Sequence, residues 1–192
     1  MIITTNKSTY SFEEYLEFEE TADYKNEYQD GEIVPITGVT TEHNKIAFNF
    51  ASYLKFALKR KKEKHNIFIG DVKLYIPQYH QGTYPDVMVI DGEPIYYGKG
   101  KTTVTNPSLI VEVLSKSTQN YDQGDKFLYY RSISQFKEYI LINQSQYYVM
   151  QYNKTNDGKW ILNEYEGENS ILSLILVDFE ITFEELYEGV VF

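Results

Sequence analysis

The chain has 192 residues, the usual size of one domain, and its 42% of apolar residues are enough to bury a core. Its formal net charge of −10 is the reverse of what a simple nucleic-acid-binding domain carries. It has no cysteine, no apolar run near the roughly 18 to 20 residues of a transmembrane helix, and no signal-peptide layout in its opening MIITTNKSTY. We therefore expect a cytoplasmic protein without a membrane partner.

The first expected elements are a short helix and a β-hairpin. The stretch STYSFEEYLEFEE begins with a serine or threonine cap followed by acidic residues, which predicts a helix. In NEYQDGEIVPIT, the pair Asp30-Gly31 stands between two strand-like segments and predicts a tight turn.

A long amphipathic helix is expected from Glu42 to about Lys64. Its apolar residues recur at helical spacing: Ile46, Ala47, Phe50, Leu54 and Ala57. At 100° per residue, Lys55, Lys59 and Lys62 fall on the opposite face. This basic stripe is either a solvated helix face or a track that contacts the phosphates of a nucleic acid.

Strands and a second helix follow. The three segments NIFIGDVKLYI, TYPDVMVID and SLIVEVLS read as strands, with a turn near residues 78–82 that folds the first two into a hairpin. TQNYDQGDKFLYYRSI is helical in pattern, and KEYILINQ, QYYVMQYN and KWILNEYEG are further strands, the last two joined at Asn156-Asp157-Gly158. TFEELYEG closes with a capped helical turn. We predict a single α+β domain whose core order is helix, three strands, helix and strand.

Two carboxylates interrupt the apolar core strands. Asp86 opens the segment that contains Met88 and Ile90, and Glu112 lies in the middle of the next strand. If these strands are neighbours, the alternation of side chains brings both carboxylates to one end of the sheet. Two adjacent carboxylates repel unless a proton or a cation lies between them, and a hard cation such as Mg²⁺ satisfies both. The alternatives are a solvent-facing aspartate and a glutamate paired with lysine or arginine.

These segments resemble a known family. Pro85-Asp86 and the strand with Glu112 resemble the PD-(D/E)XK nuclease superfamily, which shares the core order given above. The closer resemblance is to the Uma-two family of restriction-endonuclease-like proteins. It rests on SFEEYLEFEE, NEYQDGEIV, TTEHNKIAFNF, YPDVMVIDGEP, NPSLIVEVLSKST, YDQGDKFLYYRSI and FKEYILINQ in family order. The resemblance implies one restriction-endonuclease-like domain over 1–192, with an N-terminal helix and hairpin (1–41), a nuclease-like core (42–142) and C-terminal strands with a short helix (143–192).

The resemblance also implies an activity, a metal-dependent endonuclease acting on DNA. Asp86, Glu112 and the backbone carbonyl of Val113 would hold Mg²⁺ or Mn²⁺. The superfamily's lysine, two residues after the glutamate, is replaced here by Leu114. The family pattern offers Lys126, which we expect at a helix start after Gly124-Asp125, to orient the attacking water. A surface helical lysine is the alternative.

Other candidates in the site are weaker. Glu27 matches a recurrent family glutamate and is a possible further metal carboxylate. If the hairpin turns near Tyr79, Asp71 falls opposite Asp86, and Lys73 becomes a rival to Lys126. His43 matches a family histidine, although a polar contact at the helix start explains it equally well. We expect Tyr130 to belong to the core and not to the catalytic groups.

The expected partners are DNA and a second copy of the chain. Cutting both strands of a duplex takes two sites, and the tyrosine-rich strands after residue 138, with Tyr147, Tyr148 and Tyr152, offer an interface. The main alternative function is a catalytically inert nuclease-fold protein that binds nucleic acid or oligomerises. A hydrolase of small molecules or nucleotides on the same scaffold is a third reading.

Overall fold

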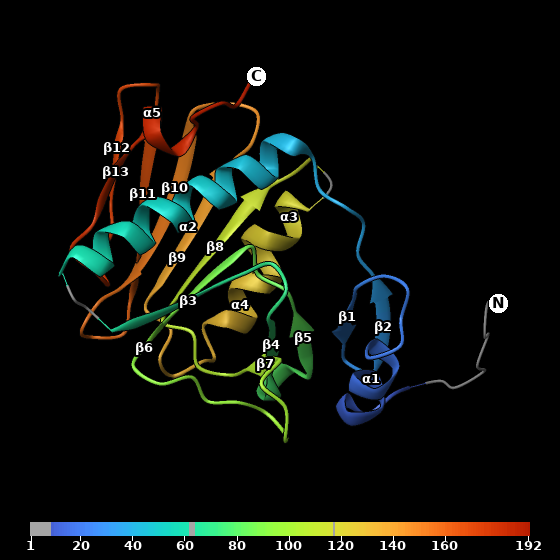
Figure 1. Cartoon of the computed structure of the whole chain (residues 1–192). Coiled ribbons are helices and arrows are strands. Elements are labelled where there is room, and N and C mark those ends of the chain that lie inside the picture. Colours follow the sequence, from blue (N-terminus) through green and yellow to red (C-terminus); the bar gives the residue numbers. More distant parts are fainter. Residues whose placement is uncertain (1–8, 62–63, 117) are drawn as a thin grey trace.

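The computed structural model describes residues 9–61, 64–116 and 118–192. Over these residues the chain has a mixed α+β fold, as predicted, with three β-sheets and flanking helices (Figure 1). The helical segments are α1 (Phe12–Glu19), α2 (Thr41–Lys61), the 3-10 turn η1 (Pro77–Tyr79), α3 (Gln119–Tyr121), the π-helical turn η2 (Asp122–Lys126), α4 (Phe127–Tyr130) and α5 (Phe183–Leu186). The strands are β1 (Asn26–Gln29), β2 (Glu32–Pro35), β3 (His65–Ile69), β4 (Lys73–Ile76), β5 (Gln81–Thr83), β6 (Val87–Asp91), β7 (Thr103–Val104), β8 (Leu109–Leu114), β9 (Glu138–Asn143), β10 (Tyr148–Lys154), β11 (Trp160–Glu166), β12 (Ile171–Ser173) and β13 (Glu180–Thr182).

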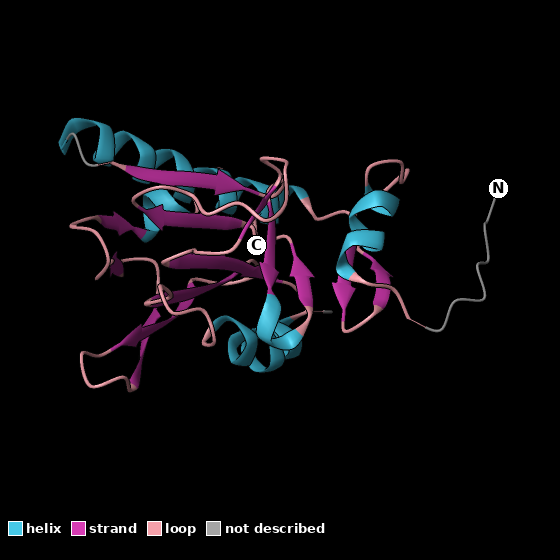
Figure 2. Cartoon of the chain, turned by 90° about the horizontal axis from the view of Figure 1, so that it is seen from below, coloured by secondary structure: helices cyan, strands magenta, loops and turns pink. Residues whose placement is uncertain are grey.

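The largest sheet forms the middle layer of the molecule. In the part of the chain described, it has six strands in the order β11-β10-β9-β8-β6-β3, with β8 and β9 parallel and the other neighbours antiparallel. Helix α2 crosses one face and α3 to α4 lie on the other (Figures 1 and 2). Val87 and Val111 pack on the α2 side, whereas Met88 and Ile110 pack on the α4 side. The order α2, β3, β6, β8, α3–α4 and β9 confirms the predicted core.

Each of the first two predicted core strands changes sheet halfway along. The predicted strand 66–76 divides into β3 and β4, and β4 belongs to a second sheet of order β2-β1-β5-β4-β7. The predicted strand 83–91 divides in the same way into β5 and β6. Gly70 has a left-handed φ of 48°, and Pro85 has no N–H to give to a ladder, so both strands break here. The Gly70 N–H donates to the carbonyl of Asp86 at 3.1 Å. The prediction of two uninterrupted strands is therefore wrong.

The turn between β4 and β5 is confirmed where it was predicted. It consists of η1 and His80, which has a φ of 49°. The pairs Leu74 with Thr83 and Ile76 with Gln81 fix the register of this short hairpin.

The N-terminal elements confirm the predicted helix and hairpin. Ser11 and Glu14 form a reciprocal capping box at the start of α1. Asp30 and Gly31 both have positive φ, 46° and 96°, as the tight turn between β1 and β2 requires. Strand β1 also pairs with β5, which joins this part of the chain to the second sheet (Figure 1).

Helix α2 buries its apolar stripe and exposes its basic one. The residues Ile46, Phe50 and Leu54 are fully buried against the large sheet. Lys55 and Lys59 are exposed. Lys62, the third residue of the predicted basic stripe, lies outside the described residues.

The helical run from α3 to α4 contains a π-helical turn. The turn η2 spans Asp122 to Lys126, and the side chains of both residues are buried towards the sheet. π-helical turns are rare, and they are frequently found at functional sites. Lys126 lies inside the run, so the predicted helix start after Gly124-Asp125 is wrong.

The C-terminal residues complete the α2 side of the core. The hairpin of β10 and β11 turns at residues 155–158, as predicted, and Gly158 has a φ of 83°. Strands β12 and β13, which are too short to be recognised in the sequence, pair antiparallel. Thr182 and Glu185 form the capping box of α5, which packs near α2. Among the described helices, none has the length and apolar character needed to cross a membrane.

Candidate active site

The two carboxylates of the core strands lie side by side. Strands β6 and β8 pair antiparallel with Val87 opposite Val111, so the next step of the register places Asp86 opposite Glu112. The Asp86 N–H donates to Glu112 Oε2 at 3.4 Å, and the Val113 N–H donates to Asp86 Oδ2 at 2.7 Å. Strand pairing thus brings the two predicted metal carboxylates to one end of the large sheet.

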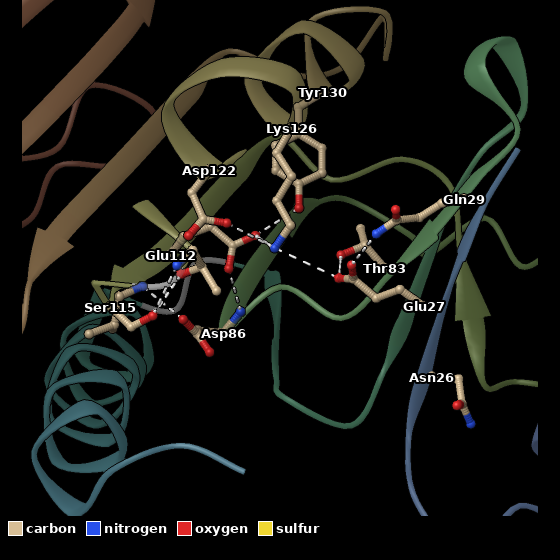
Figure 3. Close-up of polar contacts among 12 residues, drawn as sticks. Asn26, Glu27, Gln29, Thr83, Asp86, Glu112, Ser115, Asp122, Lys126 and Tyr130 are labelled. Atoms are coloured by element: carbon tan, nitrogen blue, oxygen red, sulfur yellow. Dashed lines mark hydrogen bonds and ion pairs between the residues drawn. The ribbon is translucent and has the colours of Figure 1, made fainter. Parts of the chain in front are cut away.

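The ammonium of Lys126 lies among three carboxylates (Figure 3). Its Nζ is 3.2 Å from Glu112 Oε1, 3.1 Å from Asp122 Oδ1 and 3.7 Å from Glu27 Oε1. The η2 turn carries both Lys126 and Asp122, and β1 carries Glu27. The contact with Asp122 is an ion pair without hydrogen-bond geometry. Asp122 Oδ1 is buried, and it accepts no hydrogen bond from any described residue.

Tyr130 and His43 hold the carboxylate pair from opposite sides. The Tyr130 hydroxyl donates to Glu112 Oε1 at 2.7 Å, and the His43 Nε2 lies 2.8 Å from Asp86 Oδ1. Tyr130 is fully buried, as predicted for a core residue, but its hydroxyl also reaches the site. The sequence left His43 open between the site and a helix-start contact. The structure shows both, since the backbone N–H of His43 also donates to Thr40 Oγ1 at 3.2 Å.

Burial dominates the electrostatics of the site. Glu112 is 4% exposed, and its pKa is raised to about 8, chiefly because burial penalises the charged form. The charges of Asp122 and Asp86 act in the same direction as burial, and the Lys126 ammonium opposes it. For Lys126, burial lowers the pKa, but Glu112, Glu27 and Asp122 outweigh burial and raise it well above the usual value. Lys126 therefore stays protonated, whereas the protonation state of Glu112 changes with pH and with the charges around it.

The pH dependence of stability should report on Glu112. Its pKa in the fold is raised to about 8 from the ordinary 4.5, so protonated Glu112 contributes stability that is complete below about pH 4.5 and lost as the pH rises to about 8. We expect the melting temperature of the wild type to fall relative to that of Glu112→Gln across this window in metal-free buffer. Circular dichroism melts at several pH values measure the difference. The exposed Glu93→Gln is the control, and a pH-independent offset for Glu112→Gln would contradict the prediction.

A cleft opens beside this cluster. Its volume is about 560 Å³, and its walls come from β1, the loop after β2, the first turns of α2 and the ends of β6 and β8. Asp86, Glu112, Asp122 and Lys126 line its floor, and Phe48, which is 62% exposed, stands on its wall. A ligand can therefore reach the acidic cluster from solvent.

The second-tier candidates divide between site and surroundings. Glu27 joins the cluster, where it accepts a hydrogen bond from the Thr83 hydroxyl and one from Gln29 Nε2 at 3.3 Å. Asp71 borders the cleft, but its side chain is 83% exposed and pairs with Lys25. Lys73 lines a neighbouring cavity instead of the cleft, because the break before β4 carries it into the second sheet.

Sequence reasoning missed Asp122. It stands four residues before Lys126 on the same helical run, a spacing that places two side chains on one face. That spacing was the available signal. It does not tell a solvated pair from a buried one, and here both residues are buried.

The predicted basic stripe does not line the cleft. Lys59 stands 16 residues after His43 on α2, about 24 Å along the helix axis. The predicted interface tyrosines are half-buried within their own chain. Tyr147 packs against Tyr187, Tyr148 bonds to Glu164, and Tyr152 packs against Phe127.

The donor set fits a hard divalent cation in a limited way. Within the described residues, no three His, Asp or Glu side chains surround a common point as a formed metal site. However, Asp86 and Glu112 are adjacent oxygen donors, and Mg²⁺ typically takes one or two protein carboxylates and completes its shell with water and phosphate oxygens. Asp122 and Glu27 add further negative charge beside them, since they share the single Lys126 ammonium with Glu112. The residues present therefore fit a cation held by two carboxylates.

Fold and site define a protein of the restriction-endonuclease-like class, and comparisons with known proteins agree. A family model described as "Putative restriction endonuclease" matches residues 12–184, and the chain belongs to this family, Uma2. The resemblance seen in the sequence is thereby confirmed.

Relatives and a solved structure resemble the chain over most of its length. "Uncharacterized protein sll1609" of Synechocystis sp. is 41% identical over 88% of this chain and 94% of its own. "Uncharacterized protein slr1290" of the same organism is 31% identical over 94% of this chain and 92% of its own. The crystal structure of "a putative nuclease belonging to DUF820 from Anabaena variabilis" has a TM-score of 0.74 over 95% of this chain and 99% of that chain. With 14% identity, it shows the fold alone.

Proposed function

We propose that the chain is a metal-dependent endonuclease that hydrolyses phosphodiester bonds of DNA. Asp86 and Glu112 hold Mg²⁺ or Mn²⁺, with the Val113 carbonyl as a further ligand, and Lys126 orients the attacking water. One observation carries the proposal. A buried lysine is held by carboxylates beside an adjacent acid pair, at the floor of an open cleft.

The residues of the chain divide the chemistry between them. When bound, the cation would supply Lewis-acid stabilisation of the charge that develops on the phosphate. The raised pKa of Lys126 keeps its ammonium protonated, so it donates hydrogen bonds and does not act as a base. With Glu112 fixing its position, Lys126 can direct one N–H towards a water in the cleft. His43 and Tyr130 hold Asp86 and Glu112 in place.

The position of Lys126 supports its proposed role in place of a lysine at residue 114. Leu114 is buried in the α4-side cluster, on the same face of β8 as Glu112. The η2 turn packs over this face and delivers the Lys126 ammonium to 3.2 Å from Glu112. A side chain from the helix thus reaches the region that the superfamily's strand lysine would occupy.

A cleavage assay tests the proposal. Purified protein is incubated with supercoiled, linear and single-stranded DNA in Mg²⁺, Mn²⁺ or EDTA, with Glu112→Gln as the matched control. We expect cleavage that needs a divalent cation and Glu112. Metal-independent cleavage, or equal activity of Glu112→Gln, would overturn the assignment of the site.

The basic stripe of α2 is proposed as a contact for DNA phosphates at a distance from the cleft. Replacing Lys55, Lys59 and Lys62 with glutamine should weaken binding and reduce the slope of log affinity against log salt by about 0.9 for each phosphate that is no longer neutralised. Fluorescence anisotropy with a labelled duplex at several salt concentrations measures this slope. An unchanged slope would identify the stripe as a solvated helix face.

An inert nuclease-fold protein is the second candidate function. Two observations favour it: the ammonium of Lys126 is already held by carboxylates, and the net charge of −10 disfavours DNA. Under this reading the protein binds nucleic acid or oligomerises without cutting. The same cleavage assay separates the two, since the inert protein would leave every substrate intact in every metal.

We also propose a homodimer, because cutting both strands of a duplex takes two sites and the acid pair supplies one. Its interface would use the exposed parts of the tyrosine-rich strands β10 and β11. Light scattering at tens of micromolar protein, with and without DNA, measures the mass in solution. A monomeric mass in both conditions would contradict the dimer.

A further inference from the structure

A second cavity adjoins the cleft of the candidate active site. Its volume is about 390 Å³, and it is lined by the end of α1, by β4 and by the loop that precedes β7. Tyr84 and Asp71 border both cavities, so these side chains stand between the two. The second cavity holds none of the carboxylates that surround Lys126.

Lys73 supplies a buried positive charge to this cavity. The residue is 6% exposed, and it makes no hydrogen bond or ion pair through its side chain with any residue that the structure describes. Its ammonium lies over the rings of Tyr15 and Tyr84, at 4.8 and 5.5 Å from their centroids. Burial lowers the pKa of Lys73, although the charges of Glu19 and Glu20 oppose this. A buried cation without an anionic partner is costly, and three N–H donors remain available here.

Three carboxylates also line the cavity, those of Glu19, Glu20 and Asp71, but none of them forms an ion pair with Lys73. Asp71 is paired with Lys25 instead. Glu19 is already engaged: it accepts from the Asn26 N–H and amide, each at 3.0 Å, and from the Tyr84 hydroxyl at 2.7 Å. The hydroxyl of Thr103 is buried in the cavity wall without a hydrogen-bond partner among the described residues. Lys99, on the Gly98–Gly100 loop, adds an exposed ammonium at the rim.

Among the described residues, the cleft itself lacks a comparable cation. Of the lysines that line it, Lys25 is paired with Asp71 and Lys126 with three carboxylates. A strand whose scissile phosphate lies at Asp86 and Glu112 also carries phosphates on either side. In the adjoining cavity, Lys73 and Lys99 carry ammonium groups that are not paired with the carboxylates of its lining.

We propose that the Lys73 cavity binds a phosphate group of the nucleic-acid strand that occupies the cleft, next to the scissile phosphate. Lys73 and the Thr103 hydroxyl donate to the phosphate oxygens, and Lys99 closes over it from the loop. The cavity is then a subsite that sets the register of the nucleic-acid strand in the cleft. This proposal rests on the proposed nuclease function.

Binding of labelled oligonucleotides in EDTA, where no strand is cut, tests the subsite. Lys73→Met is compared with Lys101→Met, which removes the same charge from an exposed lysine that does not line the cavity. We expect Lys73→Met to weaken binding on the order of tenfold, as for loss of one charged hydrogen bond, and to reduce the salt slope by about 0.7 for a single strand. Equal affinity and slope for wild type and Lys73→Met would overturn the proposal.

Two further measurements separate the subsite from other roles of Lys73. Thermal melts show whether Lys73→Met remains folded. Because it removes an unpaired buried charge, we expect its melting temperature to equal or exceed that of the wild type. A large drop would identify Lys73 as a structural contact of Tyr15 and Tyr84 and overturn the subsite. Lys73→Arg, which keeps the charge, should restore most of the binding.

The source of the phosphate is tested with inorganic phosphate alone, by calorimetry. If inorganic phosphate binds through Lys73 while oligonucleotides ignore the substitution, the cavity takes free phosphate and the strand assignment is wrong. If oligonucleotides bind through Lys73 but the wild type never cuts them, the subsite stands and the endonuclease proposal fails. The two proposals can therefore fail separately.

Discussion

Replacing Asp86 with asparagine is expected to abolish Mn²⁺ binding and to lower any phosphodiester cleavage by about 10³-fold or more. Asparagine has the shape of aspartate but not its charge, and a hard divalent cation depends on that charge. The remaining oxygen can still accept from the Val113 N–H, which donates to Asp86 at 2.7 Å, so the fold should persist. Loss of the Asp86 charge also removes one of the causes that raise the pKa of Glu112.

Isothermal calorimetry with Mn²⁺ and a cleavage assay measure the two effects of Asp86→Asn. Asp91→Asn is the matched control, because Asp86 directly precedes β6 and Asp91 ends it, with a side chain that is 52% exposed. Unchanged Mn²⁺ affinity in Asp86→Asn would remove Asp86 from the metal site, whatever the outcome for cleavage.

Replacing Lys126 with methionine is expected to reduce the rate of cleavage by about 10²-fold or more while Mn²⁺ still binds. The methionine keeps the length of the side chain but leaves the attacking water without its donor. It also leaves Glu112, Asp122 and Glu27 without their shared cation, and removing one partner of a buried ion pair typically costs about 3 to 5 kcal/mol of folding free energy. The loss of stability should be smaller below about pH 8, where Glu112 is protonated.

Single-turnover kinetics and denaturant melts of Lys126→Met separate chemistry from stability. Lys116→Met, at an exposed lysine of the preceding loop, is the control. Adding Leu114→Lys to Lys126→Met restores a lysine two residues after Glu112 and should recover part of the rate. Full activity in Lys126→Met would exclude it as the residue that orients the water.

The sequence predicts the carboxylate pair because that pair depends on strand alternation. Side chains in a strand alternate with a period of two, so Asp86 and Glu112 could be assigned to faces, and strand pairing then set them opposite each other. The strand breaks at Gly70 and Pro85 were not predicted. Both residues stand in otherwise strand-like runs, and the choice between one sheet and two depends on tertiary partners such as β1 and β7.

The helical side of the site was predicted less well. Asp122, Lys126 and Tyr130 belong to one helical run, and a helical pattern alone does not reveal which of its polar residues are buried. The π-helical turn also changes the direction of the side chains that follow it, and no residue pattern in the sequence marks such a turn. The hydroxyl of Tyr130 therefore reaches Glu112 although the residue reads as core.

The change of sheet at Gly70 and Asp86 places the candidate site at a joint. Glu112 belongs to the large sheet and Asp86 directly precedes its strand β6, whereas Glu27 is carried by β1 of the second sheet. Lys126 contacts carboxylates from both sheets. A shift of the β1–β2 hairpin relative to the large sheet would change the 3.7 Å separation of Lys126 Nζ and Glu27 Oε1. The pairing of β6 with β8 would stay intact. The charge balance around Lys126 therefore depends on how the second sheet is placed against the large one.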